Sequence, residues 1–134
     1  RSIEARAAQT LGDASYADLA LRGLDFLLRE CVMDGEPAHY HDGAPRVFGL
    51  AVDRTSLASA LLDAHDHTGD ARWLDAADAI TLSLLRRFWS DAEKGIVDRL
   101  VEPGDAGELA RPRKIIRDNA LAAENFARLW RRRR

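Results

Sequence analysis

Two histidines separated by one residue, His39 and His41, are the first side chains whose types and spacing could do chemistry. In an extended segment alternate residues point to the same face, so the two imidazoles would lie together. Such a pair could bind a metal ion or act as acid and base. Because no third ligand stands at a recognised metal spacing, we predict neither a metal site nor a cofactor. A polar loop that happens to contain two histidines is the competing interpretation.

Two carboxylates stand where predicted helices begin, at Asp53 and Asp118. Each could be an N-cap, because a side-chain oxygen there accepts a backbone N–H of the first helical turn. Each could instead hold a sugar hydroxyl or act as a base. Arg54 and Asn119 follow directly and could bind hydroxyls or a carboxylate, although a structural salt bridge is the alternative for Arg54.

A repeated pattern predicts the helices that position these groups. The segments "LGDASYADLALRGLDFLLRE" (11–30) and "TGDARWLDAADAITLSLLRR" (68–87) share the Gly-Asp start and the order of their apolar residues. Glycine suits the left-handed position after one helix, and aspartate caps the next. Apolar residues then recur at helical spacing, so we predict an outer helix after each Gly-Asp turn. Their apolar stripes are Ala17, Ala20, Leu24, Leu27, Cys31 and Trp73, Ala77, Ile80, Leu84, Phe88.

Two further segments predict inner helices. Residues 52–67 are apolar nearly all round in the middle, which is typical of a helix buried on several sides. Residues 117–130 match them and end in Trp130, which we predict to pack in the core. Residues 3–13 resemble the tail of a third inner helix.

The loops between outer and inner helices are long, 33–52 and 90–117, and we predict short strands in 46–52 and 95–101. Both long loops should emerge at the end opposite the Gly-Asp turns, beside the N-termini of the inner helices. A pocket at that mouth would collect the polar residues His39, Tyr40, His41, Asp42, Arg46, Asp53, Arg54, Asp98, Arg99, Lys114, Asp118 and Asn119.

The composition excludes several classes of protein. With 20 basic and 22 acidic residues, the chain lacks the basic surplus of a nucleic-acid binder. No apolar run reaches the length of a membrane span, and one cysteine excludes an internal disulfide framework. We therefore expect a single region over residues 1–134, located in the cytoplasm, without a nucleic-acid or membrane partner.

The runs "ASALLDAHDHTGDARWLDAADAITLSLLRRFWSDAEKGIVD" and "RPRKIIRDNALAAENFARL" resemble the helical region of thioredoxin-domain-containing proteins of the spermatogenesis-associated type. That region is similar to the N-acylglucosamine 2-epimerase and six-hairpin glycosidase group. The resemblance implies an all-α fold of antiparallel helical hairpins, part of an (α/α)6 toroid with short strands in the long loops. A ring of six hairpins needs roughly three times this length, so we expect a piece of a larger toroid. The chain has no Cys-x-x-Cys, so redox chemistry is not implied.

The resemblance implies sugar binding, or the acid–base chemistry of an epimerase or glycosidase, in the mouth of the full ring. We expect Asp53, His39 and His41 to be catalytic and Arg46, Arg54, Asp118 and Asn119 to bind the substrate. The expected partners are a carbohydrate and either the remainder of the ring or a second copy of the chain. The alternative is a non-enzymatic helical scaffold that binds another protein.

Overall fold

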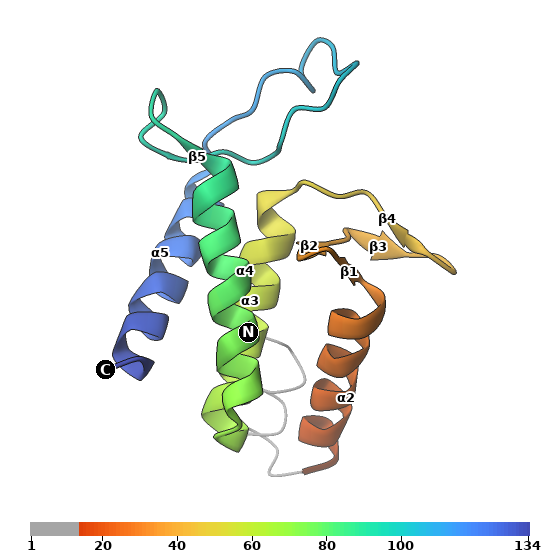
Figure 1. The fold of residues 1–134 in the computed structure, drawn as a ribbon, viewed down its shortest axis with the longest axis vertical. Coiled ribbons are helices and arrows are strands. Elements are labelled where there is room, and N and C mark those ends of the chain that lie inside the picture. The colour runs from red at the N-terminus through yellow and green to blue at the C-terminus, as the bar shows by residue number, and fades with distance from the viewer. Residues whose placement is uncertain (1–13) are drawn as a thin grey trace.

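Four helices and three pairs of short strands make up the described part of the chain. The computed structural model describes residues 14–134. The helices are α2 (Ala14–Glu30), α3 (Ala51–Thr68), α4 (Ala71–Phe88) and α5 (Ile116–Arg132) (Figure 1). The antiparallel strand pairs are β1 (Val32–Met33) with β2 (Glu36–Pro37), β3 (Tyr40–His41) with β4 (Pro45–Arg46), and β5 (Trp89–Ser90) with β6 (Gly95–Ile96). The fold is mostly helical, as predicted, and a toroid remains a prediction.

The connection between α3 and α4 is the short turn that the sequence predicts. Gly69 has a φ of 72°, in the left-handed region, and its N–H donates to the carbonyl of His65. Asp70 then caps α4, because its carboxylate accepts the N–H of Arg72 at 3.0 Å. This confirms the turn at Gly69. The matching turn at Gly12 and the expected helix over residues 3–13 lie outside the described residues.

Both long loops emerge at the end opposite this turn, as expected (Figure 1). They are bonded to each other there, since Ala51 N–H donates to Asp98 O at 2.8 Å and Leu100 N–H donates to Gly49 O at 2.9 Å. The strand prediction for 46–52 is only partly right. Arg46 is in β4 and Leu50 forms a single bridge to Arg99, but Ala51 and Val52 already belong to α3.

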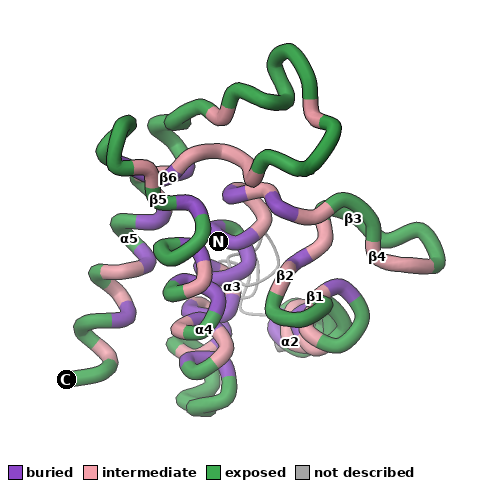
Figure 2. Tube along the Cα trace, turned by 45° about the horizontal axis from the view of Figure 1, so that its top comes forward, coloured by how far each residue is buried: buried purple, intermediate pink, exposed green. Residues whose placement is uncertain are grey.

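The core lies where α3 meets α4 and α5, and Figure 2 shows the buried residues concentrated there. The stripe predicted for α4 is buried throughout, and α3 is buried on several sides. On α2 the prediction is less accurate, because Ala17, Leu24 and Cys31 are buried whereas Leu27 is 40% exposed. The prediction for Trp130 is wrong, since 58% of it is exposed.

The arginines at the end of the chain hold α5 onto its neighbours. Arg128 donates to Asp63 at 2.6 Å and to Asp66 at 3.0 Å, and Arg132 also donates to Asp66. Arg133 pairs with two aspartates of α4, at 2.8 Å and 3.3 Å. Arg128, Arg132 and Arg133 are therefore engaged in ion pairs within the bundle. Across the described residues, none of the helices combines the length and the apolar character that a bilayer span requires.

Candidate functional site

His39 and Asp53 form a hydrogen-bonded pair at the N-terminal end of α3. His39 Nδ1 lies 2.9 Å from Asp53 Oδ1, and the histidine side chain is half exposed while that of the aspartate is only 14% exposed. The loop fixes the backbone of His39, whose N–H donates to the carbonyls of Arg46 and Val47. An ionised carboxylate only accepts, so Nδ1 carries the hydrogen and Nε2 is left as the basic atom. The arrangement suits a general base oriented by a carboxylate.

The second oxygen of Asp53 is buried and finds no hydrogen-bond partner among residues 14–134. A buried carboxylate oxygen without a donor is unfavourable, because its lost hydration is not replaced. Asp53 therefore has one oxygen committed to His39 and one that a ligand donor could satisfy after a small movement of the side chain.

Asp118 is a second carboxylate at this end, on the first turn of α5. It is only 7% exposed. Burial raises the pKa of Asp118 above its usual value; Arg117 opposes this, and the negative charges of Asp98 and Asp53 raise it further. Asp53, Asp98 and Asp118 therefore lie near one another, at the mouth where the sequence predicts them. A carboxyl group with a raised pKa can donate a proton where an ordinary aspartate cannot.

Neither Asp53 nor Asp118 is an N-cap. The caps are Leu50 and Ile115, whose side chains make no capping hydrogen bond, and both aspartates lie inside the first helical turn. At the start of α3 the Ala51 N–H is instead satisfied by the carbonyl of Asp98. The capping prediction is therefore wrong for both aspartates.

Arg54 lies inside the protein and not at the mouth. It is fully buried, pairs with Glu36 of β2, and has its guanidinium 5.0 Å from the ring centre of Phe88. Burial lowers the pKa of Arg54 to about 10, although the charge of Asp53 raises it. Arg87 pairs with the same Glu36. This is the structural salt bridge that the sequence allowed, and it ties the first long loop to α3 and α4.

Asn119 is also occupied by structure. Its Oδ1 accepts the Ile96 N–H at 2.8 Å, and its Nδ2 donates to the carbonyls of Ile96 and Ile115 at 2.8 Å and 2.9 Å. The two bonds to Ile96 join β6 to the start of α5, and the bond to Ile115 lies within the start of α5. The amide is thereby committed to positioning the second loop.

His41 and Arg46 lie in the β3–β4 hairpin, which projects away from the helices (Figure 1). The His41 ring makes an edge contact with Phe26, at 5.5 Å between centres, while His39 contacts Asp53. Arg46 pairs with Asp42 at 3.1 Å, where both side chains are exposed. The two histidines therefore have different partners, and the structure brings only His39 to the carboxylates.

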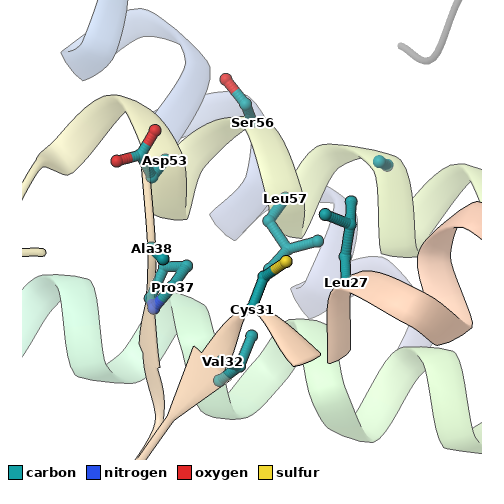
Figure 3. A pocket seen from close by; sticks show the side chains of 9 residues that line it. Leu27, Cys31, Val32, Pro37, Ala38, Asp53, Ser56 and Leu57 are labelled. Atoms are coloured by element: carbon teal, nitrogen blue, oxygen red, sulfur yellow. The ribbon is translucent and has the colours of Figure 1, made fainter. Parts of the chain in front are cut away.

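A pocket of about 230 Å³ opens beside Asp53, between α2 and α3. Figure 3 shows its lining, which comes from α2, β1, β2 and α3. The lining residues are Leu27, Cys31, Val32, Pro37, Ala38, Asp53, Ser56, Leu57 and Ala60. Burial, followed by the charge of Glu30, raises the pKa of the Cys31 thiol, so this cysteine is kept as an unreactive thiol. Asp53 thus lies between an apolar pocket on one side and polar groups on the other.

Within residues 14–134, no three His, Cys, Asp or Glu side chains are placed to hold a metal ion together. His65 lies at the other end of the bundle, where its Nδ1 contacts the Asp70 carbonyl at 3.1 Å. The chain matches no family model, no curated protein and no solved structure in the comparisons made with each. The resemblance to the spermatogenesis-associated and epimerase-like proteins therefore stays a prediction.

Proposed function

We propose that the end of the bundle where α3 and α5 begin binds a small polyhydroxylated molecule, a sugar, and performs acid–base chemistry on it. The proposal assigns the chain to part of a carbohydrate-active (α/α) toroid. The observation that carries it is the pairing of His39 with Asp53 close to a second carboxylate, Asp118, whose pKa is raised. A carboxyl group with a raised pKa near a histidine that a carboxylate orients is typical of an acid and a base at one site.

The roles follow from the environments of the three groups. His39 Nε2 takes a proton from the ligand, and Asp53 holds the ring and stabilises the imidazolium that forms. Asp118, in its protonated form, gives a proton to a ligand oxygen. Abstraction next to a carbonyl would give an epimerase, and use of two carboxylates at a glycosidic bond would give a glycosidase. Arg54 and Asn119 serve as positioning residues, because Arg54 pairs with Glu36 and Asn119 is hydrogen-bonded to the backbone of Ile96.

Calorimetric titration with a panel of monosaccharides, including 2-acetamido sugars, tests this proposal. The wild-type chain should bind at least one sugar with a dissociation constant of about 1 mM or lower, which corresponds to a binding free energy of about −4 kcal/mol. Asp53→Asn should weaken binding about tenfold or more, since it removes the charge that orients His39. The matched control is His65→Gln at the opposite end, which should leave the affinity unchanged. Equal affinity of the wild type and Asp53→Asn would reject the site.

A second candidate, a helical scaffold that binds protein, is favoured by large apolar side chains on the surface. Exposed examples on α2 are Leu19 and Phe26, and on α5 they are Ile116, at 84% exposure, and Trp130. Exposed apolar residues that gather on one helix face are typical of an interaction surface. Titration with sugars would then give no heat, while association through these faces would persist.

A further inference from the structure

Helix α5 has two apolar faces, and only one of them is covered by the rest of the described structure. The covered face contains Ala122 and Leu129, which are buried in the cores shared with α3 and α4. On the opposite side five apolar residues follow one another at spacings of four and three, and all five are exposed. They are Ile116, Ala120, Ala123, Ala127 and Trp130, named here the outer stripe of α5.

The outer stripe is a continuous feature, because residues at these spacings stack along one side of a helix. Its large residues stand at the two ends, where Ile116 is 84% exposed and Trp130 is 58% exposed. Three alanines lie between them. Small residues in the middle let another helix axis approach closely, and large residues at the ends can anchor it.

Helix α3 shows how the same face is covered elsewhere in this molecule. The two helices begin alike, with Leu50 and Ile115 at the caps and Asp53 and Asp118 in the first turn. In this register Ala58 of α3 corresponds to Ala123 of α5. Ala58 is only 1% exposed.

The side of α3 that carries Ala58 faces α4. One turn before it, Arg54 stacks on Phe88 of α4, and about two turns after it, His65 contacts the Asp70 carbonyl at the start of α4. The positions of α5 that correspond to Ala58 and His65 are Ala123 and Trp130, and both are exposed. The outer stripe therefore includes the face that, on α3, packs against an antiparallel outer helix.

We infer that the outer stripe of α5 is a docking surface for an amphipathic helix of the α4 kind, packed antiparallel to α5. The occupant is a partner helix whose buried stripe has an aromatic residue near its start, then alanine, isoleucine and leucine, as Trp73, Ala77, Ile80 and Leu84 do in α4. This inference rests on the scaffold candidate and is separate from the sugar site, which lies at the end of the helices.

Charge supports this choice of partner and its direction. An antiparallel helix places its N-terminus beside the C-terminal end of α5, where Arg131 is exposed and the exposed Arg134 stacks on Trp130, 3.4 Å from the centre of its ring. Helix α4 carries Asp75 and Asp78 in its N-terminal half, and these already pair with Arg133 across the α4–α5 contact. Acidic residues at the start of the docked helix would meet arginines in the same way.

A fluorescent peptide with the sequence of residues 68–90, which includes α4 and its Asp70 cap, is the probe for this surface. Fluorescence anisotropy with the full chain should show binding with a dissociation constant of about 10 μM or tighter. Ala123→Glu in the chain should weaken binding at least tenfold, because it puts a charge in the middle of the outer stripe. The matched control is Ala79→Glu, an exposed alanine of α4, which should leave binding unchanged.

Three results would overturn the inference. In the first, the peptide fails to bind. In the second, it binds the wild type and Ala123→Glu equally, which would mean that it replaces the chain's own α4 on α3. Sedimentation could instead show a dimer that Ala123→Glu dissociates while the peptide stays unbound, which would make a second copy the occupant. Sugar titration of Ala123→Glu separates the two proposals, since the sugar site should be unaffected.

Discussion

Asn119 holds the backbone of Ile96 from both sides, accepting its N–H and donating to its carbonyl, each at 2.8 Å. A single side chain thus fixes the β5–β6 hairpin to the first turn of α5. These hydrogen bonds also explain why Asn119, although next to Asp118 in sequence, is unavailable to a ligand.

Replacing Asn119 with Ala should lower the free energy of unfolding by about 2–3 kcal/mol. Three hydrogen bonds disappear, and backbone groups of Ile96 that are partly buried lose their partners. Urea unfolding followed by circular dichroism measures the change. Glu124→Ala, an exposed change on the same helix, is the control and should stay within about 0.5 kcal/mol of the wild type.

Gly95→Ala should also destabilise the chain, by about 1–3 kcal/mol. A Cβ at this position would come within 2.7 Å of Lys114 Cδ and 2.8 Å of Asn119 Oδ1.

Gly23→Ala should have the opposite effect and raise stability by about 0.5–1 kcal/mol, because Gly23 lies within α2 with nothing within 4 Å of the added carbon. Thermal unfolding should show a lower melting temperature for Gly95→Ala and a higher one for Gly23→Ala than for the wild type. A Gly95→Ala variant as stable as the wild type would mean that the β5–β6 hairpin does not approach α5 this closely.

Asp118→Asn should raise stability at pH 7. The pKa of Asp118 is raised by burial and by neighbouring aspartates, so its charged form is disfavoured in the folded state. A raised carboxyl pKa gives stability that is present below the unfolded pKa and is lost as the pH rises through the folded one. The measurement is the free energy of unfolding from pH 3 to 8, in which the variant should gain over the wild type as the pH rises. A loss at neutral pH would show that the charge is stabilised.

Asp66 should show the opposite dependence on pH. Burial alone would raise its pKa, but hydrogen bonds and charges from Arg132 and Arg128 outweigh this and lower it. A lowered pKa gives stability that is present above the unfolded value and is lost as the pH falls through the folded one, below about pH 4. Asp66→Asn should therefore remove about 0.5–1 kcal/mol at pH 7 and little at pH 3, and 1 M salt should reduce the difference. A variant with the same loss at both pH values would contradict this explanation.

The sequence predicts the helices well because their determinants are local. The stripe from Trp73 to Phe88 and the Gly69–Asp70 turn are set by spacing and by backbone preference, and both are found. The exposure of Trp130 could not be predicted in this way, since its spacing is the same whether or not another helix covers it. Periodicity identifies an apolar face but does not say which neighbour is present.

The candidate site was predictable as a region but not as a set of contacts. The order of helices and long loops places His39, Asp53 and Asp118 at one end, and they lie there. The spacing of His39 and His41 suggests a pair, but the path of the loop gives them different partners, Asp53 and Phe26. Such contacts between residues distant in sequence depend on the path of the first long loop, which no local pattern encodes.

The most direct test of the proposed function is a nuclear magnetic resonance titration of the ¹⁵N-labelled chain with the same monosaccharides. If sugar binds where α3 and α5 begin, the backbone amide signals that move should be those of His39, Asp53, Asp98 and Asp118, and they should move together with one dissociation constant. Shifts confined to His65, His67 and the Gly69 turn would place the ligand at the wrong end of the bundle, and a panel that moves no signal would contradict sugar binding by this chain.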